Sequence, residues 1–240
     1  MQIFGIALDD LSRGTALARC KAWLDGDGFH RITTVNPEFL LRAREDILFA
    51  QNLRSADLRL VDGFGIVIVG WLRGKKIHRC PGADLMESLL VYAERKSYPV
   101  FFAVRQDGLS SSEEVRQALK KKYPALIMDG SVVDGRNRAS AWNDVRRQTL
   151  VSRAKIVFSN FGAPEQEYFV ESLRQNPGDV RLAIGIGGGL DYLTGKIPRA
   201  PRCMRAMGLE WFWRLMRQPK RVGRIWRATV VFLLRSILDK

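Results

Sequence analysis

Short apolar runs alternate with longer segments of helical periodicity along most of the chain. Each apolar run has the length of a buried strand, and the segments between them place apolar residues at helical spacing. We predict strands at residues 2–8, 29–35, 58–61, 99–104, 126–128, 155–160 and 180–186. We predict helices at residues 12–24, 37–55, 83–96, 111–122 and 144–152. The alternation predicts an α/β fold, with a Rossmann-like, largely parallel sheet covered by helices.

Local residues mark where three of these helices begin. Ser12 precedes the first helix, Asn36 and Pro37 open the second, and Ser111 opens the fourth ahead of two glutamates. Serine and asparagine side chains accept hydrogen bonds from the first N–H groups of a helix, and proline fits its first position. We therefore predict N-caps at Ser12, at Asn36 and at a serine ahead of Glu113 and Glu114.

The segment 57–85 is where we place the chemistry. A buried strand ends at Asp62, and Gly63 and Gly65 follow in a turn before a helix. Ligands of open α/β sheets bind beyond the carboxyl ends of the strands, so we expect Asp62 at the rim of a cleft. Arg79 follows, and a carboxylate beside an arginine suits removal of a proton near a phosphate leaving group. The alternative is an aspartate that only stabilises a strand-ending turn.

Two other strands deliver polar groups to the same rim. Thr34 and Asn36 end the strand at 29–35, and Gln166 follows a small-residue turn after the strand at 155–160. Thr34 and Asn36 either cap the next helix only or also line the cleft beside Asp62.

The glycine run at 185–189 is similar to a dinucleotide-binding turn, but it lacks the third glycine of that fingerprint. We expect no nicotinamide or flavin there, whereas a glycine turn that lets backbone approach a diphosphate remains open. Asp25 and Asp27 form an Asp-x-Asp pattern that can hold a divalent metal, but between a helix and a strand it is typical of a plain turn. We predict no cofactor and no metal.

Composition adds a strong positive charge to this picture. The 240 residues carry a net charge of +14, which indicates an anionic partner: a nucleic acid, a phosphorylated ligand or an acidic membrane surface. Cys20, Cys80 and Cys203 stand far apart, which favours a reducing compartment and no zinc site. We find neither a signal-peptide pattern at the start nor an apolar run of about 18 residues that could span a membrane.

Most of the excess charge lies near the end of the chain. Residues 199–240 hold eleven Lys or Arg and two acids, a net charge of +9, together with bulky tryptophans and phenylalanines. A helical wheel places Trp226, Leu233 and Ile237 on one face and Arg227 and Arg235 opposite. This pattern predicts an amphipathic helix at an interface rich in anionic lipid. One alternative is a helix docked on the protein's own core; nucleic-acid binding is another, but no recognition motif supports it.

A set of motifs, each weak alone, follows a specific order and spacing. They are Thr34-x-Asn36-x-Glu38, Asp62-Gly63, Arg79-x-Pro81-Gly82-x-Asp84-Leu85, Gly162-x-Pro164-x-Gln166-Glu167, Gly187-Gly188 followed by Asp191, Arg199-Ala200-Pro201, and Gly208-Leu209-Glu210-Trp211 followed by Arg214, Arg221 and Arg224. With these motifs over most of its length, the chain resembles the WecG/TagA/CpsF family of bacterial glycosyltransferases.

The resemblance implies an enzyme that transfers a sugar from a UDP-sugar to a lipid-diphosphate-linked acceptor in surface polysaccharide synthesis. It implies peripheral attachment to the cytoplasmic face of the plasma membrane, and inversion at the anomeric carbon. Asp62 matches the family's proposed base; Thr34, Asn36, Arg79, Gln166 and Asp191 match substrate-site positions. Arg214, Arg221 and Arg224 match arginines of a C-terminal appendage that closes over the site and meets the diphosphate.

We accordingly divide the chain into a catalytic domain, residues 1–195, and a membrane-associating appendage, residues 196–240. The apolar helices of the chain would also allow self-association. Departures from the family pattern are Glu165, where a lysine is usual, and Arg105, where a small residue is usual. They leave glucose, N-acetylmannosamine and a uronic acid open as the donor sugar. The alternative function is a non-catalytic, membrane-associated nucleotide-binding module.

Overall fold

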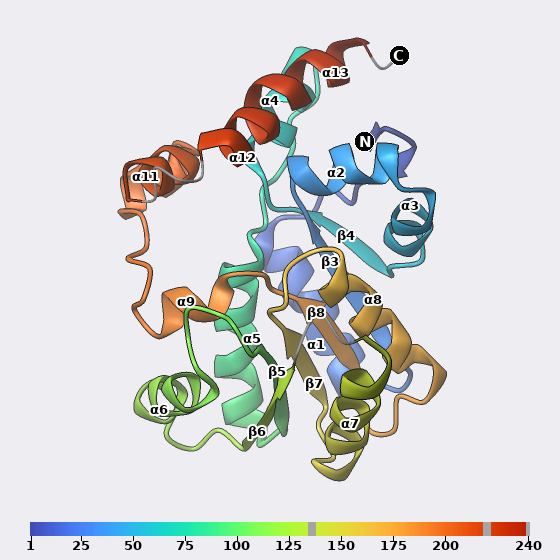
Figure 1. Cartoon of the computed structure of the whole chain (residues 1–240), viewed down its shortest axis with the longest axis vertical. Helices are drawn as coiled ribbons and strands as arrows, with labels where there is room; N and C mark the ends of the chain where they lie inside the picture. The colour runs from blue at the N-terminus through green and yellow to red at the C-terminus, as the bar shows by residue number, and fades with distance from the viewer. Residues whose placement is uncertain (134–137, 218–221, 239–240) are drawn as a thin grey trace.

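The computed structural model describes residues 1–133, 138–217 and 222–238, and it is built on a six-stranded parallel sheet (Figure 1). The strand order is β4-β3-β8-β7-β5-β6, and every pairing within this sheet is parallel. Its strands are β3 (His30–Val35), β4 (Leu58–Val61), β5 (Val100–Arg105), β6 (Met128–Val133), β7 (Ile156–Ser159) and β8 (Leu182–Gly185). The predicted α/β, Rossmann-like class is confirmed.

Helices cover both faces of the sheet. They are α1 (Arg13–Asp25), α2 (Pro37–Glu45), α3 (Ile47–Arg54), α4 (Phe64–Leu72), α5 (Gly82–Lys96), α6 (Ser112–Lys122), α7 (Arg138–Val151), α8 (Glu165–Ser172), the short η1 (Leu173–Gln175) and α9 (Gly189–Leu193). Successive strand residues point to opposite faces. Phe102 and Phe158 pack with α1, α5 and α6, whereas Phe101 and Val157 pack with α7 and α8.

The predicted caps form. Ser12 accepts a hydrogen bond from the Thr15 N–H, Asn36 accepts one from Phe39, and Ser111 forms a reciprocal capping box with Glu114. These contacts involve residues three apart, so sequence alone could locate the starts of α1, α2 and α6.

The predicted first strand, residues 2–8, is wrong as a single strand. It is a small antiparallel hairpin of β1 (Gln2–Ile3) and β2 (Ile6–Ala7), separate from the main sheet. Phe4 and Gly5 turn the chain with φ angles of 49° and 72°, the left-handed region that glycine adopts readily and phenylalanine rarely does.

Other boundaries also differ from prediction. The single helix expected over 37–55 breaks between α2 and α3, because Asp46 leaves helical geometry and its side chain caps α3 by accepting from the Phe49 N–H. The strand expected at 126–128 starts only at Met128 and continues to Val133, paired along the whole of β5. The helix expected at 144–152 begins earlier, at Arg138.

The last part of the chain leaves the sheet at α9 and returns along the molecule to the end where α4 and α2 lie (Figure 1). It comprises α10 (Arg202–Ala206), α11 (Glu210–Arg217), α12 (Val222–Trp226), a π-helical turn η3 (Arg227–Val231) and α13 (Phe232–Leu238). Across the described residues, none of the helices combines the length and apolar character needed to cross a membrane.

The C-terminal helix α13 docks on the protein's own core. Phe232 is fully buried and meets the Phe4 ring edge-on, with the ring centroids 6.1 Å apart. Arg73 donates to the Ser236 carbonyl at 2.7 Å, and Arg235 pairs with Glu45 at 2.8 Å. Trp226 and Ile237, both on the predicted apolar face, remain largely exposed. The C-terminal helices α12 and α13 therefore divide their apolar side chains between the core and the surface.

Candidate active site

A cleft of about 970 Å³ opens beyond the carboxyl ends of the strands. Six predicted site residues line it: Thr34, Asn36, Asp62, Arg79, Gln166 and Asp191. They come from the ends of β3 and β4, from the approach to α5, and from the starts of α8 and α9. The expectation that these strand ends converge on one rim is met; the roles of the side chains stay predictions.

Asp62 follows β4 directly. Its backbone N–H donates to the Val35 carbonyl at 2.9 Å, which continues the β3–β4 pairing by one residue. Gly63 comes next, and a Cβ there would lie 2.2 Å from the Pro37 ring, so only glycine lets the start of α4 pass the start of α2. The Asp-Gly pair thus places a carboxylate at the cleft with its backbone fixed by two neighbouring elements.

Thr34 and Asn36 are held by the fold and also face the cleft. The Thr34 hydroxyl donates to the Gly185 carbonyl at 3.3 Å, and its side chain packs against Gly82, where a Cβ would lie 2.9 Å from Oγ1. Asn36 caps α2, as the plainer interpretation holds, and lines the cleft as well. The two interpretations of these residues are therefore compatible.

Gln166 is almost fully buried, with an exposed fraction of 2%. Its Oε1 accepts hydrogen bonds from the backbone N–H groups of Gly162, at 3.1 Å, and Gly187, at 3.0 Å. Its Nε2 donates to Glu167 at 3.0 Å. The side chain thus ties together two glycine turns that both line the cleft.

Arg79 connects the Asp62 turn with the C-terminal segment. Its Nε donates to the Asp62 carbonyl at 2.6 Å, and its Nη2 pairs with Glu210 at 2.7 Å. The Tyr192 hydroxyl donates to the other Glu210 oxygen at 2.9 Å. Asp191, next to Tyr192 on α9, accepts from the buried Ser110 hydroxyl at 2.8 Å. The cleft is thus bounded on this side by hydrogen-bonded polar side chains from α9 and α11.

Four more arginines line the cleft, each beside a carboxylate. The ion pairs are Arg42 with Asp46, Arg105 with Asp107, Arg199 with Asp84, and Arg227 with Glu45. The hydrogen bonds that Arg105 donates to Asp107 raise the pKa of Arg105, which therefore stays charged. Guanidinium groups bind phosphate and carboxylate oxygens with the same fork of N–H donors, so an incoming diphosphate can exchange with these carboxylates.

Cys80 lies beneath the same rim. Burial raises the pKa of its thiol to about 12, and the nearby charges of Asp62 and Asp84 add to the effect. The thiol is therefore neutral near pH 7 and unsuited to nucleophilic attack. Asp62 is one of several carboxylates that line the cleft, and its role as the base stays a prediction.

The three appendage arginines cannot be placed. Arg221 lies outside the described residues, and so do the side chains of Arg214, on α11, and Arg224, on α12. The metal alternative at the Asp25 loop finds no support, because Asp25 accepts from the hydroxyls of Tyr92 and Tyr98 and does not line the cleft. Within the described ranges, no group of three or more His, Cys, Asp or Glu residues gathers as metal ligands do.

Two residues of this region, Tyr192 and the buried Arg31, were not predicted from the sequence. Arg31 is the second residue of β3 and has none of its surface exposed, and it pairs with Glu167 at 3.2 Å and Glu171 at 2.8 Å. The signal was available, because Arg31 stands in the predicted strand at 29–35 and a buried arginine needs an acid as its partner. The identity of that acid was not, because it lies more than 130 residues away.

A parallel sheet with a cleft beyond its strand ends, lined by carboxylates and several arginines, is typical of an α/β enzyme. The chain belongs to the glycosyl transferase WecG/TagA/CpsF family, whose model matches residues 1–240. It is 33% identical over 208 residues to the N-acetylglucosaminyldiphosphoundecaprenol N-acetyl-beta-D-mannosaminyltransferase of Bacillus spizizenii strain W23, covering 85% of this chain and 77% of that protein. The protein is a glycosyltransferase, and the family resemblance is confirmed.

Proposed function

We propose that the protein transfers a sugar from a UDP-sugar to a lipid-diphosphate-linked acceptor, with inversion at the anomeric carbon. The relative's name describes a transferase that acts on a lipid-diphosphate-linked sugar, which supports this acceptor class. The observation that carries the proposal is the position of Asp62, on the rim of a cleft that arginines line on several sides. Such a cleft suits two substrates that both carry a diphosphate.

In the proposed reaction, the Asp62 carboxylate takes the proton of the acceptor hydroxyl as its oxygen attacks the anomeric carbon. The new glycosidic bond forms on the face opposite the leaving group, and the bond between the anomeric carbon and the UDP oxygen breaks. The products are the extended lipid-linked glycan, UDP and a protonated Asp62. Cleft arginines stabilise the negative charge that develops on the diphosphate, with Arg79 nearest to the Asp62 backbone.

Thr34, Asn36 and Asp191 contribute hydrogen-bonding groups around the sugar or the nucleotide. Arg214, Arg221 and Arg224 are proposed to add charge from the appendage when substrate binds. No metal enters this scheme, since the arginines supply the charge that a cation would otherwise provide.

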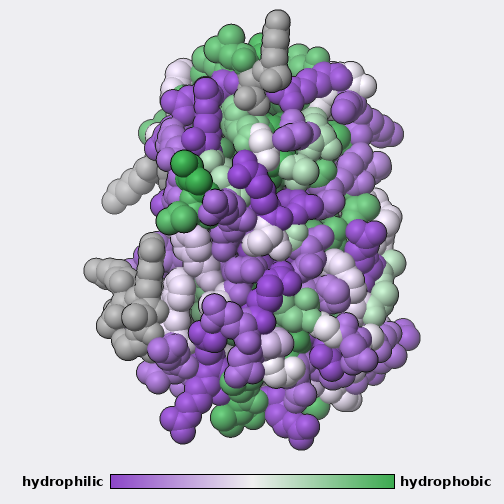
Figure 2. Space-filling view, turned by 90° about the vertical axis from the view of Figure 1, so that its right-hand side faces the viewer, coloured by the Kyte–Doolittle hydropathy of each residue, from purple (hydrophilic) through white to green (hydrophobic). Residues whose placement is uncertain are grey.

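The proposed place of action is the cytoplasmic face of the plasma membrane. Its support is the lipid-linked acceptor together with the surface at one end of the molecule. Figure 2 shows hydrophobic side chains gathered at the upper end, the end at which Figure 1 places α4 and α13. Exposed apolar residues there include Trp71, Leu72, Trp226, Leu234 and Ile237. A charged surface with such residues fits peripheral binding to anionic lipid by residues 196–240.

The test is transfer from a panel of UDP-sugars to a detergent-solubilised lipid-diphosphate sugar, with wild type and Asp62→Asn. The panel holds UDP-glucose, UDP-N-acetylmannosamine and a UDP-uronic acid. We expect turnover of one donor and a loss of at least about 100-fold in Asp62→Asn with UDP affinity retained. UDP binding without turnover of any donor would favour the non-catalytic module, and an active Asp62→Asn would remove Asp62 as the base.

A further inference from the structure

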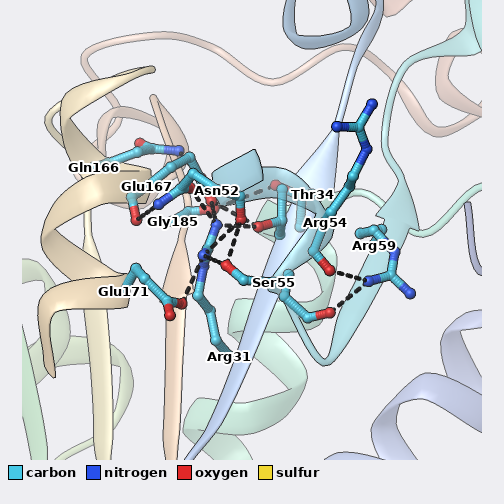
Figure 3. Close-up of polar contacts among 12 residues, drawn as sticks. Arg31, Thr34, Asn52, Arg54, Ser55, Arg59, Gln166, Glu167, Glu171 and Gly185 are labelled. Atoms are coloured by element: carbon cyan, nitrogen blue, oxygen red, sulfur yellow. Dashed lines mark hydrogen bonds and ion pairs between the residues drawn. The ribbon is translucent and has the colours of Figure 1, made fainter. Parts of the chain in front are cut away.

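Behind the cleft, a buried ionic network connects β3, α3 and α8 (Figure 3). Arg31 donates from Nη1 to Glu171 and to the Asn52 carbonyl, and from Nη2 to Glu167, the Thr33 hydroxyl and the Asn52 side chain. Arg31 and Glu167 have no exposed surface. Neither residue lines the cleft, so the network cannot touch substrate.

Glu167 accepts hydrogen bonds at both ends of its carboxylate. Its Oε2 accepts from Arg31 at 3.2 Å and from the Thr33 hydroxyl at 2.7 Å. Its Oε1 accepts from the Gln166 amide nitrogen at 3.0 Å. A carboxylate satisfies both sets of donors, whereas an amide of the same shape accepts at one end only. The charge at position 167 therefore fixes which way the Gln166 amide points.

The orientation of Gln166 decides how the two turns at the cleft are held. With its nitrogen on Glu167, its oxygen faces the N–H groups of Gly162 and Gly187 and accepts from both. Gly162 precedes α8 and Gly187 precedes α9, and both turns line the cleft. Rotating the Gln166 amide would point its N–H donors at the N–H groups of Gly162 and Gly187. The two turns would then lose the acceptor that links them.

The Gln166–Glu167 pair packs closely against the backbone of Gly185. A Cβ at Gly185 would lie 2.4 Å from Glu167 Oε1 and 2.6 Å from Gln166 Nε2. Gly185 also accepts from Thr34 through its carbonyl, so the end of β8 is held between a cleft residue on one side and the amide–carboxylate pair on the other.

We infer that Arg31 and Glu167 are positioning residues for sugar transfer: through Gln166 they hold the Gly162 and Gly187 turns at the spacing that the substrates require. The inference deepens the proposed function and rests on it for the reaction alone. Small displacements of groups that position reactants reduce turnover strongly. Loss of the carboxylate at 167 should therefore lower kcat by about 10- to 100-fold and alter the donor KM less.

The decisive variant is Glu167→Gln, which keeps the shape and removes the double acceptor. In the full-length protein we expect its backbone amide resonances of Gly162 and Gly187 to shift and kcat to fall. The matched control is Glu171→Gln, which removes the other carboxylate on Arg31 without touching Gln166, at a side chain 27% exposed. It should leave both resonances and kcat close to wild type. Unshifted resonances or a wild-type kcat in Glu167→Gln would overturn the inference.

Two further measurements separate positioning from general destabilisation. Glu167→Gln should cost little more kcat/KM in a Gln166→Ala background, because both changes act through one side chain; additive losses would contradict this. If Glu167→Gln does not fold, Thr33→Val removes one donor to Glu167 and should shift the same two resonances in a milder way. The resonances need no donor sugar, so they judge the network even if every UDP-sugar fails to react.

Discussion

Arg79 and Glu210 fasten the C-terminal segment to the turn that carries Asp62. The ion pair measures 2.7 Å between Nη2 and Oε2, and the two side chains are only 18% and 13% exposed. The same guanidinium donates to the Asp62 carbonyl, and Tyr192 holds the second Glu210 oxygen. Glu210 thus links the start of α11 to the turn at the rim of the cleft.

Replacing Glu210 by alanine should loosen α10 and α11. The change leaves the Arg79 charge and the Tyr192 hydroxyl without this acceptor, at a cost of about 1–3 kcal/mol in the free energy of unfolding. We expect faster proteolysis within residues 199–217 and a lower kcat/KM for transfer. Limited proteolysis followed by mass spectrometry measures the first effect.

The control for this change is Glu113→Ala on the exposed start of α6, which should alter stability by less than about 0.5 kcal/mol. The stability of Glu210→Gln should lie between those of Glu210→Ala and Glu113→Ala, since its amide can still accept from one partner. Equal proteolysis of Glu210→Ala and wild type would show that the pair does not hold the segment.

Sequence predicted the features that neighbouring residues determine. The strand ends, the caps at Ser12 and Asn36, and the Asp62-Gly63 turn all depend on periodicity or on residues a few positions apart. For this reason Thr34, Asn36, Asp62, Arg79 and Gln166 could be assigned to one cleft before any contact was known, whereas Asp191 came only from the family resemblance.

Features that depend on distant contacts could not be predicted. The burial of Phe232 requires Phe4, at the other end of the chain, and the ion pair of Arg31 requires Glu167. The break at Asp46 was also missed, because an aspartate caps a helix only when the chain around it turns. The amphipathic pattern of the tail fitted both a membrane surface and the protein's own core. The structure shows that Phe232 packs into the core.

Two glycine-to-alanine changes should have opposite effects. Gly185→Ala forces a Cβ against the Glu167 and Gln166 side chains and should reduce both stability and transfer. Gly14→Ala lies in the exposed first turn of α1, where a Cβ meets nothing closer than 3.8 Å, and should stabilise the protein by about 0.4–1 kcal/mol. Urea titration of the two variants measures the difference, and a stable, active Gly185→Ala would contradict the close packing at β8.

The cysteines should differ in reactivity. Burial raises the thiol pKa of both Cys20 and Cys80 to about 12, whereas Cys203 is exposed. At pH 8 the thiolate fraction of the two buried residues is about 10⁻⁴, so iodoacetamide should label Cys203 alone in the native protein. Labelling of all three in denaturant is the control. Native labelling of Cys80 at the rate of Cys203 would contradict the packing beneath the Asp62 rim.

Membrane attachment should depend on the exposed apolar residues of the C-terminal helices and not on Phe232. Trp226, Leu234 and Ile237 are 60%, 59% and 58% exposed, so replacing all three with serine should leave the fold intact. Each such side chain gains about 1.5–3 kcal/mol on full burial, so even partial insertion predicts at least a tenfold loss of binding to anionic vesicles, measured by co-sedimentation. Phe232→Ser should instead lower the melting temperature, because it empties a fully buried site.

The matched control is Val91→Ser with Val151→Ser, which removes exposed apolar side chains from α5 and α7. These helices lie away from the α4–α13 end of the molecule (Figure 1), and the control should bind vesicles as wild type does. Binding should also weaken as salt rises, because arginines such as Arg227 attract anionic headgroups over about 10 Å at 0.1 M salt. A triple variant that still sediments with anionic vesicles, or equal binding to neutral vesicles, would assign attachment to another surface.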